Sequence, residues 1–144
     1  MDLNDLLPAA EPVWFHLTDL RGDEMTSEGQ PVRLRLHGPD SPTMLAFERK
    51  RTDKQLSAMK RKGRGELDID ASGLDDLATE QAIAALADWE WTGLTIDGKP
   101  APFSPESART LVASVRWIRD WIVEKVRDRG NFGRTTAGEI SPES

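Results

Sequence analysis

The segment from residue 104 to residue 130 constrains the fold more than any other, because it carries helix signals at both ends. Ser104 can accept a hydrogen bond from a free amide of the first turn, and Pro105 fits the first helical position, where no amide hydrogen is needed. Glu106 places negative charge at the positive end of the helix dipole. At the far end, arginines occupy the last turn and Gly130 is predicted to form a left-handed C-cap. These signals predict helical structure across the segment.

Between these ends, apolar residues recur at helical spacing and form one stripe that two tryptophans widen. The stripe covers roughly half of the helix circumference, more than a surface helix needs. One interpretation is a well-buried core helix, and the other is a partner-binding surface along the tryptophan edge, because Trp is enriched at interface hot spots. Whether Ala113–Ser114 divides the run into two helices is left open. The stripe consists of Leu111, Val115, Ile118, Ile122 and Val126. The candidate partner-binding residues are Trp117, Ile118, Trp121, Ile122 and Phe132.

A strongly basic segment stands apart from an acidic remainder. Residues 49–64 hold eight Lys or Arg and one acid, a charge of +7, so the remaining 11 basic and 24 acidic residues amount to −13. Such a segment fits a solvated helix, a nucleic-acid site or a docking surface for an acidic protein. Nucleic acid is the weaker interpretation, because no aromatic residues interleave and the rest of the chain repels phosphate. The basic residues are Arg49, Lys50, Arg51, Lys54, Lys60, Arg61, Lys62 and Arg64.

The first third of the chain has the alternating pattern of strands. Residues 32–37 alternate apolar and basic side chains, and residues 13–17 match them across an antiparallel pair. The polar connection between them predicts a long exposed hairpin loop. A lone hairpin is marginal in water, so it must pack on helices or gain a strand. The other short strand candidates are Leu67–Ile69 and Leu94–Ile96.

Capping and helix-starting residues divide the rest of the chain into predicted elements. Asp40 or Ser41 caps a helix that Pro42 opens, and the composition from Leu74 to Trp89 predicts a second helix. The predicted fold class is α+β, mostly helical, with a small N-terminal antiparallel β-hairpin or sheet packed on a C-terminal helical bundle. The predicted divisions are a flexible tail (1–12), one domain (13–132, comprising a hairpin at 13–37, a basic helix at 41–62 and a helical core at 72–130) and a disordered tail (133–144).

Composition excludes several kinds of chemistry. The chain has 144 residues, enough for one domain with a modest core, and no cysteine, so disulfides and thiolate sites are excluded. Its two histidines, His16 and His37, lack metal-ligand spacing and suit no catalytic triad. No apolar run reaches the ~20 residues of a membrane span, and the N-terminus lacks a signal-peptide pattern. We therefore expect a cytosolic, non-enzymatic protein without cofactor, metal or membrane attachment.

The order of motifs in the second half resembles the C-terminal pattern of tail assembly chaperones of long, non-contractile-tailed phages and related prophages. The strand at residues 32–36, followed by a Gly-Pro-Asp-Ser-Pro turn and a basic helix, is also similar to their N-terminal half. The likeness covers residues 12–132. Its motifs are Trp89-x-Trp91-x-Gly93-Leu94-x-x-Asp97-Gly98-Lys99-Pro100-x-Pro102-Phe103-Ser104-x-Glu106-x-Ala108-x-x-Leu111, then Trp117-Ile118-x-x-x-Ile122, then Asp128-Arg129-Gly130-Asn131-Phe132.

This resemblance implies a role in the host cytoplasm and absence from the finished particle. Such chaperones bind the tape-measure protein, keep its hydrophobic helices soluble and help to recruit tail-tube subunits. Self-association is also expected, because large exposed apolar patches rarely stay uncovered. Two alternatives remain open: a nucleic-acid-binding accessory protein that uses residues 49–64, and a structural tail or head–tail component.

Overall fold

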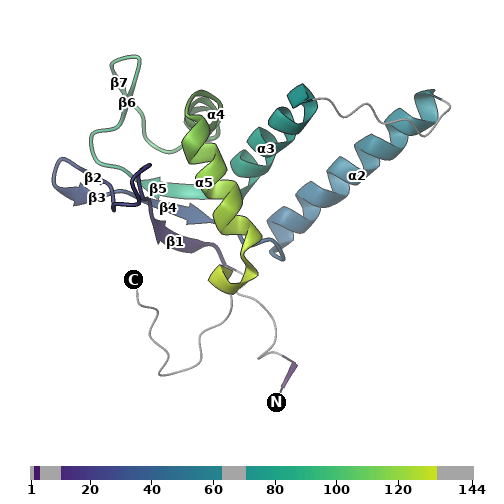
Figure 1. The fold of residues 1–144 in the computed structure, drawn as a ribbon, viewed down its shortest axis with the longest axis horizontal. Helices are drawn as coiled ribbons and strands as arrows, with labels where there is room; N and C mark the ends of the chain where they lie inside the picture. The colour runs from purple at the N-terminus through teal and green to yellow at the C-terminus, as the bar shows by residue number, and fades with distance from the viewer. Residues whose placement is uncertain (1, 4–10, 63–70, 133–144) are drawn as a thin grey trace.

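The computed structural model describes residues 2–3, 11–62 and 71–132. A three-stranded antiparallel sheet packs against helices α3 (Ala71–Ala85), α4 (Pro105–Ser114) and α5 (Arg116–Arg127), while α2 (Pro42–Lys62) projects away from this body (Figure 1). The predicted α+β class, with N-terminal strands and C-terminal helices, is confirmed. The predicted strand at Leu67–Ile69 and the predicted tail at 133–144 lie outside the described residues, as does most of the predicted tail at 1–12.

The sheet has the strand order β1 (Val13–His16), β4 (Arg33–Leu36), β5 (Leu86–Glu90). The predicted antiparallel hairpin is confirmed, since Val13 lies opposite Leu36 in the β1–β4 register. The strand that completes the sheet corrects the sequence analysis, which continued the preceding helix to residue 89. The helix ends at Ala85, and the next five residues form β5, four of which have partners in β4. A short apolar run is compatible with helix or strand, and here the open edge of β4 decides between them.

Two small hairpins extend beyond the sheet. The long loop after β1 contains β2 (Thr26–Ser27) and β3 (Gln30–Pro31), and the candidate strand at 94–96 pairs as β6 (Thr95–Ile96) with β7 (Lys99–Pro100) instead of joining the main sheet. At the tip of the second hairpin, Asp97 and Gly98 have φ values of 53° and 77°. Two successive positive φ angles are typical of a type I′ turn, which suits an Asp-Gly pair.

The helical segment predicted at residues 104–130 forms two helices, a division that the sequence left open. The Ser104 side chain accepts from the Ser107 amide, and Ser107 reciprocates in a capping box that starts α4. Val115 is extended, with φ −115° and ψ 91°, and it separates α4 from α5. The left-handed C-cap predicted at Gly130 is wrong, because α5 ends at Arg127 and a 3-10 turn, η1 (Arg129–Phe132), follows without a positive φ at Gly130. This turn places the side chain of Phe132 in the core.

Phe132 occupies a tight position between the sheet and the helices. Its ring meets Phe15 edge to face, with 5.4 Å between centroids. Gly38 faces the same ring, and a Cβ there would lie 2.8 Å from the Phe132 ring. Because a Cβ so close would force the ring or the backbone to shift, the glycine at this position permits the close approach. The core combines strand residues (Leu34, Leu36, Leu86 and Trp89), Val32 just before β4, and helix residues (Ala82, Ala85, Ala108, Leu111, Val112, Ile118, Ile122, Val123 and Val126).

Ion pairs join the helices at the rim of this core. Arg119 of α5 is almost fully buried, and its guanidinium donates to Asp75 Oδ1 of α3 at 2.7 Å. Arg116 donates to the same oxygen at 2.8 Å. These partners, with Arg119 first, hold the pKa of the Asp75 carboxyl below its ordinary value. In the same way, Arg109 of α4 forms a fork on Glu80 of α3 and lowers its pKa. Helix α3 is thereby tied to both C-terminal helices.

Candidate interaction surfaces

The five predicted partner-binding residues separate into two groups. Ile118, Ile122 and Phe132 are buried, with exposed fractions of 2%, 0% and 1%. This corrects the sequence analysis for these three residues, because a buried side chain contributes no surface to a partner. Trp117 and Trp121 are half-buried at the border of the core, so their outer edges remain accessible. The apolar stripe of α5 is therefore a core face, and only its tryptophan border reaches the surface.

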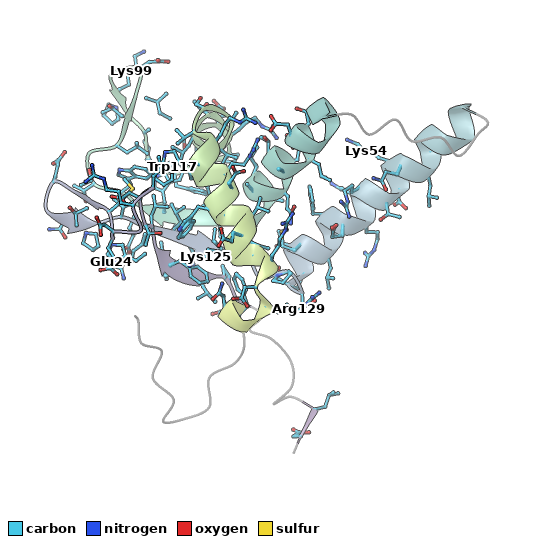
Figure 2. The ribbon with its side chains drawn as sticks, in the orientation of Figure 1. Glu24, Lys54, Lys99, Trp117, Lys125 and Arg129 are labelled. Carbon is cyan, nitrogen blue, oxygen red and sulfur yellow. The ribbon has the colours of Figure 1, made fainter. Side chains whose placement is uncertain are left out.

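We define the Trp edge as Trp117, Trp121 and Lys125. Two contacts restrain its central residue, Trp121. The Trp121 indole Nε1 donates to Thr18 Oγ1 in the loop after β1, at 2.9 Å. The Lys125 ammonium lies 5.6 Å from the centroid of the same indole, within the range of a cation–π contact. Trp117 and Lys125 mark two positions along α5 in Figure 2. The edge combines rigid aromatic surface with a cation, a combination suited to protein binding.

Helix α2 confirms the predicted basic helix and its start. Ser41 Oγ accepts from the Met44 amide at 3.3 Å, and Met44 is buried where the helix leaves the body. Arg49, Lys50 and Lys54 are exposed, and among the described side chains no ion pair engages them. Arg51 instead pairs with Glu48, with 2.7 Å between nitrogen and oxygen. The predicted basic residues Lys60, Arg61 and Lys62 lie on the helix backbone with side chains outside the description, and Arg64 lies outside the described residues.

A third surface was missed by the sequence analysis. On the sheet face opposite the core, the Trp14 ring lies 5.7 Å from the guanidinium carbon of Arg35 and 6.0 Å from that of Arg33. Arg33 is also paired with Glu90 of β5. The signal was present in the alternation, because Trp14, Arg33 and Arg35 all fall opposite the apolar positions of their strands. The Trp14 contacts follow from the predicted β1–β4 pair, in which Trp14 lies opposite Arg35. The Arg33–Glu90 pair, in contrast, requires the unpredicted strand β5.

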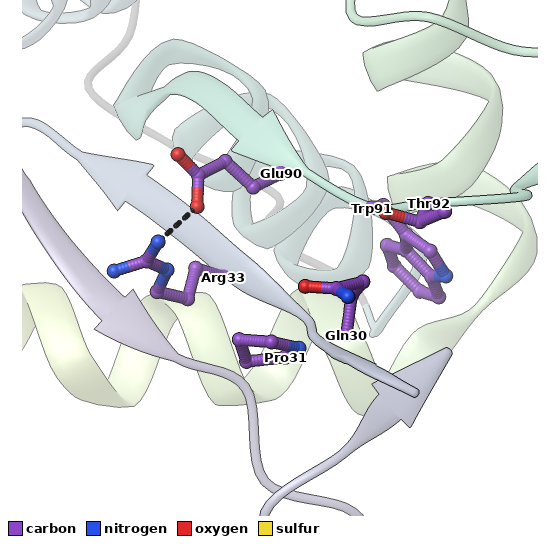
Figure 3. Close-up of a pocket in the computed structure, with 6 residues that line it drawn as sticks. All are labelled: Gln30, Pro31, Arg33, Glu90, Trp91 and Thr92. Atoms are coloured by element: carbon purple, nitrogen blue, oxygen red, sulfur yellow. Dashed lines mark ion pairs between the residues drawn. The ribbon is translucent and has the colours of Figure 1, made fainter. Parts of the chain in front are cut away.

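A shallow pocket of about 330 Å³ opens beside this surface (Figure 3). Its charged groups, Arg33 and Glu90, neutralise each other, and its remaining polar groups are amides, a hydroxyl and an indole. His37, at the end of β4, has its pKa lowered by burial and by the charge of Arg35. The pocket is lined by Gln30, Pro31, Arg33, Glu90, Trp91 and Thr92.

Within the described residues, no group of three or more His, Asp or Glu side chains is arranged to hold a metal ion. In the same part of the chain, no helix combines the length and the apolar character that crossing a bilayer requires. The described residues present three surfaces, namely the Trp edge, the basic helix and the open sheet face.

Comparison with known proteins adds no relative. No protein-family model matches the chain, and searches of curated proteins and of solved structures gave no significant match.

Proposed function

We propose that this chain is an interaction protein that acts as a tail assembly chaperone of long, non-contractile-tailed phages or prophages. In this role it would bind the tape-measure protein in the host cytoplasm, keep it soluble and help to recruit tail-tube subunits. The motif order described above supports the proposal. The observation that carries it is the Trp edge, where two half-buried indoles border the core.

The contacts of the Trp edge explain how it would bind a partner helix. Thr18 and Lys125 restrain Trp121 before any partner arrives, so little side-chain entropy remains to be lost on binding. An amphipathic partner helix could place its apolar side chains against the exposed indole edges. Ile118 and Ile122 would take part only indirectly, by anchoring α5 in the body.

The test is co-expression with the tape-measure protein encoded beside this chain, followed by affinity capture and light scattering. The expected result is a soluble complex of fixed stoichiometry, with the tape-measure protein insoluble alone. Trp117→Ala and Trp121→Ala should each weaken capture, whereas the matched control Trp14→Ala, on the open sheet face, should not. Full capture by a Trp117→Ala/Trp121→Ala variant with native circular dichroism would contradict the assignment of the surface. Absence of any complex would contradict the chaperone function.

A second candidate function is nucleic-acid binding by α2, which the projection of its exposed cations from the body favours. Phosphate contacts release counterions, so affinity should fall steeply with salt, with a slope of roughly −0.9 per contact on B-form DNA. Arg49→Gln, Lys50→Gln and Lys54→Gln should then reduce that slope in proportion. Binding that is insensitive to these changes, or absent at low salt, would remove this alternative.

The remaining alternative, a structural component of the tail or of the head–tail junction, differs in the fate of the protein. A structural component stays in the finished particle, whereas a chaperone leaves it. Mass spectrometry of purified particles distinguishes the two.

A further inference from the structure

We propose that His16 is a pH-sensitive clasp that positions the Trp edge, so that a partner binds more tightly at mildly acidic than at mildly alkaline pH. The clasp closes the acidic turn, residues 18–24, which follows β1 and contacts the Trp edge through Thr18. The effect on binding rests on the proposed role of the Trp edge, whereas closure of the turn by His16 does not depend on any partner.

Both ring nitrogens of His16 lie at hydrogen-bonding distance from acceptors. Nδ1 lies 3.1 Å from Glu24 Oε2, and Nε2 lies 3.1 Å from the main-chain oxygen of Met25. The charged imidazolium has two N–H donors and can donate to both oxygens. The neutral ring has one donor, so the lone pair of its other nitrogen would face an acceptor. The clasp is therefore complete only when the ring is charged.

The clasp is connected to the Trp edge across the neck of the turn. The acceptors of His16 belong to one arm of the turn, and Thr18 belongs to the other. Thr18 and Glu24 form an antiparallel bridge that joins the two arms. Thr18 Oγ1 also accepts from the Trp121 indole at 2.9 Å. When the His16 ring becomes neutral, one arm is held less firmly, and the support of Trp121 on the other arm weakens with it.

The charges around His16 identify its ring as the group that responds to pH. Arg33 lies opposite His16 on β4 and is paired with Glu90 of β5. Ordinary carboxyl and guanidinium groups keep their charge between about pH 5 and 8, whereas histidine titrates in this range. The charged residues that share the turn or face the ring across the sheet are Asp19, Arg21, Asp23, Glu24, Arg33 and Glu90.

The expected effect is modest because the clasp is partly open to solvent. The side chains of His16 and Glu24 are 28% and 65% exposed. Water competes for exposed ion pairs, so losing this one should weaken partner binding by about 2- to 5-fold. The direction follows from the number of donors. Binding is tighter at the acidic end of the histidine range, where both nitrogens carry protons, and weaker at the alkaline end.

The structural experiment is a pH titration of the full chain by proton–nitrogen correlation NMR, in which each indole N–H gives its own signal. Trp121→Phe assigns the Trp121 signal by its disappearance. We expect this signal to shift in step with titration of the His16 ring, and to lose that dependence in His16→Gln and in Thr18→Val. His37 is an internal reference, because burial and then the charge of Arg35 lower its pKa and its ring titrates at lower pH. A Trp121 signal that does not follow His16 would overturn the clasp.

The functional experiment is affinity capture of the tape-measure protein at both ends of the histidine range. The wild type should bind about 2- to 5-fold more tightly at the acidic end, whereas His16→Gln should bind equally at both ends. The matched control His37→Gln should keep the wild-type pH dependence. A complex whose affinity is the same at both ends would overturn the regulation and leave the chaperone function intact. Absence of any complex would contradict the chaperone function, and the NMR titration would still decide whether His16 closes the turn.

Discussion

Helices α2 and α5 differ in burial, and the difference is the reverse of what their charge content suggests. Charged residues make up six of twelve positions in α5 and nine of twenty-one in α2, so α5 is the more highly charged helix. Nevertheless α5 buries Ile118, Ile122 and Val126 in the core, whereas α2 buries Met44 at its base and exposes Leu45 and Leu56. Apolar residues at three- and four-residue spacing form a face that the body can cover, and scattered ones do not. The pattern of apolar residues, more than their number, therefore decides which helix anchors and which projects.

The largest loss of stability is expected from a substitution at the centre of the buried face of α5. Ile122→Ala removes a fully buried side chain and should lower the free energy of unfolding by about 2–5 kcal/mol. Urea denaturation followed by circular dichroism measures this change. A loss no larger than that of an exposed residue would contradict the assignment of α5 as the anchor.

Gly38→Ala tests the junction where Phe132, which follows α5, meets the loop before α2. The new methyl group would lie 2.8 Å from the Phe132 ring, so the ring or the loop must shift. We expect a destabilisation of roughly 1–3 kcal/mol, typical of overpacking. Combining Gly38→Ala with Phe132→Leu, which removes the ring, should produce less than the sum of the two single effects. Strict additivity would contradict the proposed contact.

The tie between α3 and α5 should respond to acid. The pKa of Asp75 is lowered by its hydrogen bond from Arg119, so its contribution to stability is full above the ordinary value of 3.8 and is lost as pH falls through the lowered folded-state pKa. The free energy of unfolding of the wild type should therefore fall more steeply below that pH than that of Asp75→Asn. The effect should shrink at high salt, because the carboxylate is largely accessible to solvent. Parallel pH profiles would show that this ion pair does not contribute.

The capping box of α4 should have a smaller effect. Ser104→Ala removes the acceptor of the Ser107 amide and should cost about 1 kcal/mol. Ser104→Asp, which can also accept at the cap position, is the matched control and should retain most of the stability. Thermal unfolding compares the two variants. An equal loss in both would assign the role to something other than the cap.

The smallest effect is expected on the projecting helix. Leu56→Ala removes a side chain that is half exposed, so the free energy of unfolding of the monomer should change by no more than about 0.5 kcal/mol. Measurement at high salt and low concentration excludes self-association. A loss approaching that of Ile122→Ala would show that α2 is anchored along its length, and the contrast between the two helices would disappear.

Local signals predicted much of the fold. The capping residues Ser41 and Ser104 start α2 and α4, as expected from their neighbouring prolines, and the alternation in residues 32–36 predicted the β1–β4 pair. The strand β5 was missed because its five residues continue a helical composition, and only the free edge of β4 recruits them. Of the predicted partner-binding residues, the sequence could not separate Trp117 and Trp121 from the buried three. Periodicity identifies an apolar face but does not show how much of it the body covers.

By itself, the sequence determined the features that depend on neighbours along the chain. These are the helix starts, the separation of basic and acidic segments, and the absence of cysteine chemistry. Only the tertiary structure decided that Val115 separates two helices, that η1 carries Phe132 into the core, and that Trp14 lies beside Arg33 and Arg35. The physical reason is that burial and pairing depend on groups distant in the chain. A capping residue stabilises a helix by about 1 kcal/mol. Burying a large apolar side chain contributes about 1.5–3 kcal/mol, so burial can override the local signal.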